Sequence, residues 1–143
     1  MNIIWVNGVF DIVHAGHIEL FKRASEEGDF VMVAIDDDER VRELKGDSRP
    51  INCLEDRMKV LNSIKYINGV FHYRDEDEMK KLIKFYKPTT IVIGEEYKDK
   101  RIVGKGFFNK IIYMPKYKDL SSTKILNQKP KLGWFRKIIK KQS

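Results

Sequence analysis

The stretch VNGVFDIVHAGHIEL, residues 6–20, decides the fold, because an apolar strand, a glycine turn and a helix start follow one another within it. The chain has three histidines, and two of them, His14 and His17, stand three residues apart where that helix should begin. The continuous apolar run at 2–6 is typical of a strand covered on both faces in a parallel sheet. A helix opening behind such a strand presents free N–H groups and a positive dipole end. The stretch therefore predicts a strand–turn–helix unit with an anion site.

The rest of the chain alternates apolar strands with amphipathic helices. Strands are predicted at residues 2–6, 30–35, 69–73, 90–93 and 111–114, and helices at about 15–28, 36–44, from 54 onward, and 76–86. This alternation predicts a doubly wound α/β domain with a mostly parallel five-stranded sheet and helices on both faces. Ligands of such sheets bind beyond the carboxyl ends of the strands. Those ends are the segments that start at Asn7, Asp36, Gly94 and Lys116.

Length and composition indicate the class of protein. A chain of 143 residues with a single cysteine, Cys53, predicts one compact domain without a disulfide framework. The start lacks the features of a signal peptide and no apolar run approaches the roughly 18–20 residues of a membrane span, so a cytoplasmic protein is expected. The net charge of +7 is interrupted by acidic runs at 36–39 and 75–78, which argues against a nucleic-acid-binding stripe. Phosphorylated small molecules, or simply a lysine-rich soluble surface, would explain the excess.

The residues of the first motif favour phosphate chemistry. Gly8 allows a tight turn after the strand, and Asp11 is suited to bonding local amides. His14 and His17 flank Gly16, which leaves the approach to both side chains open. As hydrogen-bond donors at a helix start, the two histidines would neutralise charge that develops during phosphoryl or nucleotidyl transfer.

Two other interpretations of these residues are open. Asp11, His14 and His17 have a spacing that also suits a zinc or iron site, although no further Cys or His cluster supports it. The histidines could instead be an ordinary cap and an ordinary surface residue, although both lie at the mouth of the predicted sheet.

Residues 8–17, GVFDIVHAGH, match the pattern G-x-F-D-x-x-H-x-G-H of the cytidylyltransferase-like nucleotidyltransferases, which the chain resembles over roughly residues 2–127. The late segment 120–125, LSSTKI, resembles the family's second motif. Within the family, KGDSRPIN at 45–52 and LEDRM at 54–58 resemble the heptose-1-phosphate adenylyltransferase domain of ADP-heptose synthesis. The segment IGEEY at 93–97 is closer to glycerol-3-phosphate cytidylyltransferases.

The resemblance implies a Rossmann-like enzyme that transfers a nucleoside monophosphate from a nucleoside triphosphate, ATP favoured, to a sugar phosphate such as heptose 1-phosphate. It implies catalytic roles for His14 and His17 at the α and β phosphates and for Lys45 at the acceptor phosphate. The implied nucleotide-binding residues are Gly8, Phe10, Asp11, Gly16, Gly94, Glu96, Ser121, Ser122 and Thr123, and the implied substrate-binding residues are Arg57 and Lys116. Mg²⁺ is expected to accompany the triphosphate, with no dedicated metal site in the chain.

Two functional alternatives remain, a cytidylyltransferase that makes CDP-glycerol or a related CDP-polyol, and an inactive nucleotide-binding module. The family resemblance also favours a homodimer. The nucleotidyltransferase domain is predicted to span 1–128, followed by a basic tail at 129–143 with Trp134, Phe135, Ile138 and Ile139 at helical spacing. This tail is expected to pack on the domain or in a dimer interface, with an anionic membrane surface as the less favoured partner.

Overall fold

The computed structural model describes residues 1–118, which form a single sheet with helices on both of its faces. The strands are β1 (Ile3–Gly8), β2 (Phe30–Asp36), β3 (Gly69–Tyr73), β4 (Thr90–Gly94) and β5 (Lys110–Met114). The helices are α1 (Ala15–Glu27), α2 (Asp38–Lys45), α3 (Leu54–Asn62) and α4 (Glu76–Tyr86), with short 3-10 turns η1 (Glu95–Tyr97) and η2 (Lys105–Phe107). The predicted elements are confirmed, apart from small shifts at their ends.

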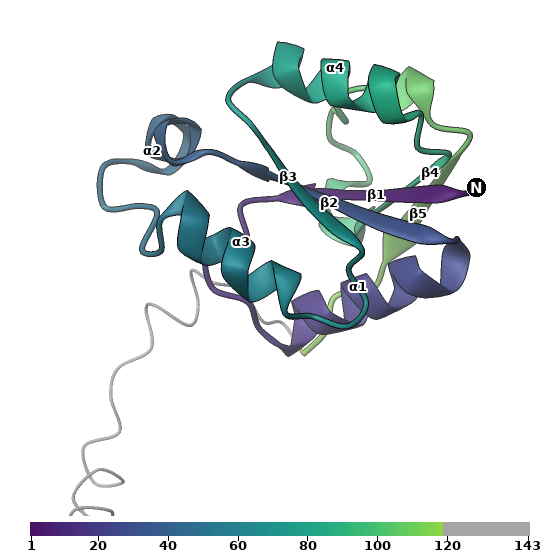
Figure 1. Ribbon diagram of the computed structural model, residues 1–143, viewed down its shortest axis with the longest axis horizontal. Helices are drawn as coiled ribbons and strands as arrows, with labels where there is room; N and C mark the ends of the chain where they lie inside the picture. Colours follow the sequence, from purple (N-terminus) through teal and green to yellow (C-terminus); the bar gives the residue numbers. More distant parts are fainter. Residues whose placement is uncertain (119–143) are drawn as a thin grey trace, which may run out of the picture.

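The sheet has the strand order β3-β2-β1-β4-β5, and every neighbouring pair is parallel. The first crossover therefore leads to one side of β1, and β4 returns on its other side. Helix α4 lies over one face of the sheet, and α1 and α3 lie over the opposite face (Figure 1). This is the predicted doubly wound architecture, and its switch point lies between β1 and β4.

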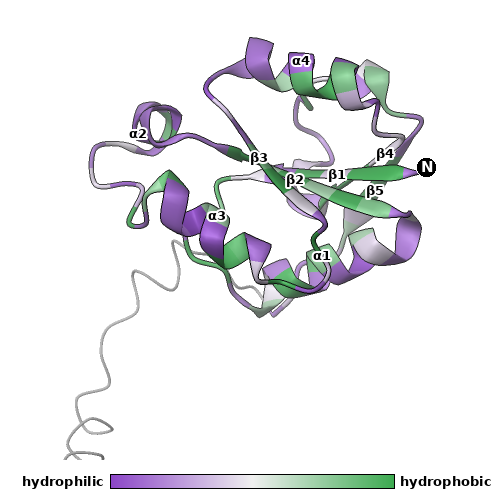
Figure 2. Cartoon of the chain, in the orientation of Figure 1, coloured by the Kyte–Doolittle hydropathy of each residue, from purple (hydrophilic) through white to green (hydrophobic). Residues whose placement is uncertain are grey.

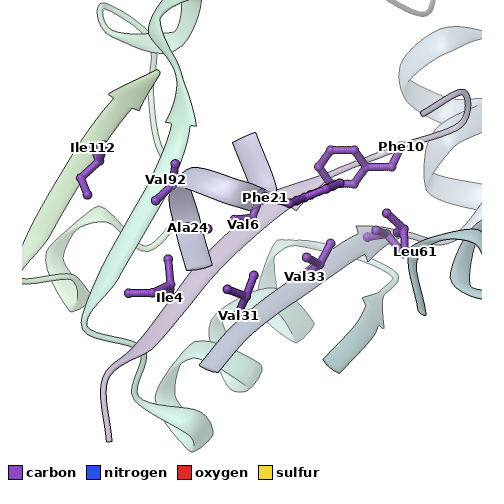
Figure 3. Packing of buried hydrophobic residues seen from close by; sticks show 11 residues of the cluster. Ile4, Val6, Phe10, Phe21, Ala24, Val31, Val33, Leu61, Val92 and Ile112 are labelled. Carbon is purple, nitrogen blue, oxygen red and sulfur yellow. The ribbon is translucent and has the colours of Figure 1, made fainter. Parts of the chain in front are cut away.

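Two apolar clusters cover the two faces of the sheet. On the α1 and α3 side, Phe21 and Ala24 of α1 pack against strand residues that include Val6 and Val33 (Figure 3). On the α4 side, Met79 and Ile83 pack around the fully buried Trp5. The central strands are hydrophobic along their length, whereas the helices are apolar mainly on the face toward the sheet (Figure 2). Burial on both faces explains the unbroken apolar runs of β1 and β2.

The helix predicted at 36–44 begins two residues later than expected. Asp36 is the last residue of β2, and Asp37 is the N-cap of α2, its side chain accepting a hydrogen bond from the Arg40 amide at 2.9 Å. Asp36 therefore lies at the carboxyl end of β2 and is not part of α2. Within residues 1–118, no helix has the length and apolar character needed to cross a membrane.

Candidate functional site

A cavity of about 660 Å³ opens at the carboxyl ends of the strands, where the sheet topology predicts a ligand. It is bounded by the ends of β1, β2, β3 and β4, by the start of α1 and by the segment after β5. The predicted site residues that line it are Gly8, Phe10, Asp11, His14, Gly16, His17, Lys45, Gly94, Glu96 and Lys116. The structure thus brings together residues more than 100 positions apart in the chain.

The two histidines form a reciprocal cap at the start of α1. His14 is the N-cap residue, and its Nδ1 accepts a hydrogen bond from the Gly16 amide at 3.1 Å. The His17 Nδ1 accepts one from the His14 amide at 3.2 Å. The two rings stack with centroids 3.8 Å apart. Because each Nδ1 is an acceptor, the proton of each neutral ring lies on Nε2, which leaves two N–H donors for a ligand.

The electrostatics keep this pair neutral before a ligand arrives. Burial is the main cause that lowers the pKa of His17, to about 4, and the nearby His14 lowers it further. Burial also lowers the pKa of His14. Two stacked imidazolium rings would repel each other, whereas a bound phosphate would favour their charged forms. The pair therefore forms the cap of α1 with neutral rings, and its role as an anion site stays a prediction.

The ring of Phe10 supports His17 from the side. Phe10 has a φ of 50°, in the left-handed region, and its ring lies edge-on to His17 with centroids 5.1 Å apart. A Cβ on Gly8 would come within 3.1 Å of that ring, so a larger residue at position 8 would push Phe10 against its neighbours. The Gly8–Phe10 turn thus fixes the orientation of His17.

Replacing Gly16 tests how closely the His14 ring must be held. A Cβ at position 16 would lie 2.9 Å from His14 Cε1 and 3.0 Å from Nδ1, so Gly16→Ala should displace the ring. We expect the turnover of the nucleotidyl transfer that the family resemblance implies to fall by about tenfold or more, because moving the ring would misplace its Nε2 donor. The melting temperature should change little, because Ala favours the helix. Gly106→Ala, where nothing lies within 4 Å of a new Cβ, is the control and should leave turnover unchanged. Equal losses in both variants would refute this role for Gly16.

The lowered pKa of His17 predicts how stability depends on pH. The unfolded side chain takes up a proton near pH 6.5 and the folded one only near pH 4. The unfolded state therefore binds more protons between these values, and His17 makes the protein less stable as pH falls from about 6.5 to about 4. As pH falls, the free energy of unfolding measured with urea should decrease less for His17→Asn than for the wild type. The asparagine amide keeps the cap acceptor but does not titrate. Identical pH dependences would contradict the assignment, as would a His17 pKa near 6.5 by NMR.

Asp11 anchors the loop that follows α2 rather than either histidine. Its carboxylate accepts hydrogen bonds from the amides of Ile51 and Asn52, both at 2.8 Å, and pairs with the Arg49 guanidinium at 2.9 Å. These partners lie about 40 residues away, so the expected local amides are replaced by distant ones. Burial raises the pKa of Asp11, but these hydrogen bonds outweigh it and lower the pKa overall. The alternative of a metal trio does not fit, because the carboxylate faces the loop.

Arg57 does not lie where the expected phosphate clamp requires. Its side chain is fully buried and is absent from the cavity lining. The guanidinium donates to the carbonyl oxygens of Asn52, Val9 and Asp36 at 2.8–3.0 Å and to the Asp38 carboxylate at 2.7 Å. The described contacts therefore give Arg57 a structural role, and a substrate-binding Arg57 stays a prediction that they do not support. Arg57 instead ties the loops after β1 and β2 to the start of α3.

The remaining predicted residues line the cavity from other elements. Lys45 is exposed at the end of α2. The Glu96 carboxylate folds over Gly94, where a Cβ would lie 2.6 Å from its Cδ, so a side chain at position 94 would displace that carboxylate. The Lys116 amide donates to the Glu95 carboxylate at 3.2 Å, which joins the segments after β4 and β5.

The structure adds cavity residues that sequence reasoning missed. Asp36 and Tyr73, at the ends of β2 and β3, and Arg40 of α2 form a polar group on the cavity wall. Burial raises the pKa of Asp36, while Arg40 and Tyr73 oppose that rise. The signal in the sequence is the position of Asp36 just after the predicted strand 30–35, but residues 36–44 are predicted as a helix and none of them as a ligand-binding residue.

Ser121, Ser122 and Thr123 lie outside the described residues, as does the tail at 129–143. The expected triphosphate contacts of the three hydroxyl residues, the domain boundary at 128 and the partners of the tail stay predictions. The same holds for the homodimer.

The fold and the site define a Rossmann-like α/β domain with a histidine pair facing a cavity at the switch point. The cytidylyltransferase-like family model matches residues 5–128. The bifunctional protein HldE of Campylobacter fetus is 36% identical over 126 residues, covering 88% of this chain and 27% of that protein. HldE of Alcanivorax borkumensis is 36% identical over 130 residues, with the same coverage of both proteins. The chain belongs to the cytidylyltransferase-like family, and it spans about a quarter of the length of these curated relatives.

Solved structures share the fold. The lipopolysaccharide core biosynthesis protein from Thermoplasma volcanium is 28% identical with a TM-score of 0.67, and the match covers 82% of this chain and 98% of that one. A pantoate-beta-alanine ligase from Francisella tularensis, at 23% identity, has a TM-score of 0.66 over 96% of this chain and 69% of its own. The second likeness concerns the fold alone.

Proposed function

We propose that this protein is a nucleotidyltransferase that moves a nucleoside monophosphate from a nucleoside triphosphate, with ATP favoured, to a sugar phosphate such as heptose 1-phosphate. The products are pyrophosphate and a nucleotide-activated sugar. The observation that carries the proposal is the stacked His14–His17 pair, which lines a cavity at the amino end of α1 with both Nδ1 atoms engaged as acceptors and both Nε2 atoms left as donors. The similarity to HldE proteins and to a lipopolysaccharide core biosynthesis protein supports the choice of acceptor.

The reaction is a single displacement. An oxygen of the acceptor phosphate attacks the α-phosphorus of the triphosphate and forms a new phosphorus–oxygen bond. The bond from the α-phosphorus to the oxygen that bridges to the β-phosphorus breaks, and its electron pair leaves with pyrophosphate. The nucleophile is already an anion at neutral pH, so no general base is needed. Catalysis then depends on positioning and charge neutralisation.

His14 and His17 would donate from Nε2 to the α and β phosphates, where negative charge builds up as pyrophosphate leaves. The free N–H groups at the start of α1 add to this field. Ser121, Ser122 and Thr123 would hold the β and γ phosphates at the start of a later helix. Each donor acts on the departing side of the reaction.

Lys45 would hold the acceptor phosphate from the opposite side of the cavity. It stands at the end of α2, next to the loop that Asp11 anchors, so a fixed loop base supports an exposed ammonium group. Lys116 would contact the substrate from the segment after β5, and the segment at 94–97 would read the base, mainly through backbone groups. These roles leave Asp11 and Phe10 as supports of the site.

Mg²⁺ would reach the site on the triphosphate oxygens. Within residues 1–118, no group of three or more His, Cys, Asp or Glu side chains is arranged to hold a metal ion. Bound to the triphosphate, Mg²⁺ supplies further neutralisation of the phosphate charge. Omission of Mg²⁺ should then abolish turnover without affecting the stability of the free protein.

A matrix of substrates tests the proposal. Pyrophosphate release is measured for ATP, CTP, GTP and UTP, each with heptose 1-phosphate, other sugar 1-phosphates and glycerol 3-phosphate. We expect the highest kcat/KM for ATP with a sugar 1-phosphate. The best rate for CTP with glycerol 3-phosphate would favour the alternative, which the Gly94-Glu95-Glu96-Tyr97 segment supports by its resemblance to glycerol-3-phosphate enzymes. Nucleotide binding without pyrophosphate release from any pair would indicate an inactive module.

A further inference from the structure

Three polar residues on the cavity wall, at the ends of β2 and β3 and in α2, have no role in the proposed reaction. Asp36 ends β2, Tyr73 ends β3, and Arg40 lies on the first turn of α2. The Arg40 Nε donates to Asp36 Oδ1 at 2.8 Å, and both side chains are largely buried, with exposed fractions of 18% and 8%. All three residues line the cavity.

A buried chain of hydrogen bonds holds this group in place. Tyr73 is hydrogen-bonded to Asp36 and to Asn7, and the Asn7 Oδ1 accepts from the indole Nε1 of Trp5 at 3.0 Å. Trp5 at one end of this chain is fully buried, and Tyr73 and Asp36 toward the other end are nearly so. The Asp36 carboxylate is thus held by Tyr73 of β3 and by Arg40 of α2. A site held in this way needs little rearrangement on binding.

Within the described part of the chain, Asp36 still has free acceptor positions, and Arg40 still has free N–H donors. A carboxylate has about four acceptor positions, of which Arg40 and Tyr73 occupy part, and a guanidinium has five N–H donors. Among residues 1–118, the Arg40 side chain donates a hydrogen bond from Nε alone. An anion would be repelled by Asp36 and a cation by Arg40. A neutral hydroxyl group, which donates and accepts at once, matches the pair.

The strand order indicates which ligand brings those hydroxyl groups. In the proposed function the histidine pair and residues 94–97 would place the nucleotide over the ends of β1 and β4. The ends of β2 and β3 lie on the other side of β1. Lys45, proposed for the acceptor phosphate, belongs to the same helix as Arg40. Resting on the proposed function, we infer that Asp36 and Arg40, oriented by Tyr73, bind hydroxyl groups of the acceptor sugar and so select among acceptors.

The test compares Asp36→Asn and Arg40→Gln with the wild type, using the sugar 1-phosphate of highest turnover and analogues that each lack one hydroxyl group. We expect both variants to raise KM for the acceptor about tenfold or more and to leave KM for the nucleotide within about twofold. The wild type should discriminate against at least one deoxy analogue, and the variants should lose most of that discrimination. A role confined to stability would not change this ratio. Arg74→Gln is the matched control, since Arg74 is an exposed arginine near Asp37 that does not line the cavity.

Unchanged discrimination in both folded variants would overturn the inference. A raised KM for the nucleotide alone would also overturn it, because the hydroxyl groups bound would then be those of the ribose. A wild type that releases no pyrophosphate with any acceptor contradicts the proposed function itself, and the inference falls with it.

Discussion

Replacing His17 with alanine should lower kcat by about 10²–10³-fold, because the variant loses an Nε2 donor aimed at the charge that develops on the departing phosphates. The protein should remain folded. The lost cap bond to the His14 amide costs about 1 kcal/mol of the free energy of unfolding. Steady-state pyrophosphate release and urea unfolding measure the two effects separately.

Two further substitutions at this position separate catalysis from capping. His17→Asn keeps an acceptor near the position of Nδ1 and removes the donor, so it should be as slow as the alanine variant while unfolding like the wild type. His17→Gln places an amide donor near the position of Nε2 and should recover part of the activity. Near-normal turnover in a folded alanine or asparagine variant would refute a role for His17 in the reaction.

Replacing Arg57 with methionine should lower the free energy of unfolding by about 3–5 kcal/mol. The change leaves the carbonyls of Val9, Asp36 and Asn52 without the donor that the fully buried Arg57 side chain supplies, and it removes the partner of the Asp38 carboxylate. Equilibrium urea denaturation gives the value. We expect any effect of this variant on activity to arise through the loops that Arg57 connects.

The control for this variant is Arg23→Met. Arg23 is 43% exposed and pairs with Glu27 at 2.8 Å on the surface of α1, so its loss should cost less than about 1 kcal/mol. If Arg57→Met were as stable as the wild type and only raised KM for a phosphate substrate, the clamp role would be restored and the structural role rejected.

The fold was predictable from the sequence because its signals are local. The buried strands β1 and β2 appear as unbroken apolar runs, and Gly8, Gly28 and Pro88 mark the ends of elements. The start of α2 was less clear, since three consecutive aspartates suit both a strand end and a helix cap. In the structure they divide these tasks, with Asp36 in the strand, Asp37 as the cap and Asp38 bound to Arg57.

The site was predictable only where its residues form a compact motif. The residues from Gly8 to His17 lie within ten positions, and the structure places them around one cavity. The partners of Asp11 and Arg57, by contrast, are set by folding together segments some 20 to 50 positions apart, and no local pattern marks them. An arginine in a helix looks the same in sequence whether it faces a ligand or three carbonyls. The Asp36–Arg40–Tyr73 group was missed for the same reason.

The most direct measurement of the central claim follows oxygen isotopes through the reaction. The acceptor sugar 1-phosphate is labelled with ¹⁸O in its phosphate group, and the products with unlabelled ATP are separated and weighed by mass spectrometry. Direct attack of the acceptor phosphate on the α-phosphorus predicts that the nucleotide sugar holds all of the label and that pyrophosphate, formed in equal amount, holds none. Label in pyrophosphate, ADP as the nucleotide product, or no nucleotide sugar from the folded protein with any sugar phosphate would contradict it.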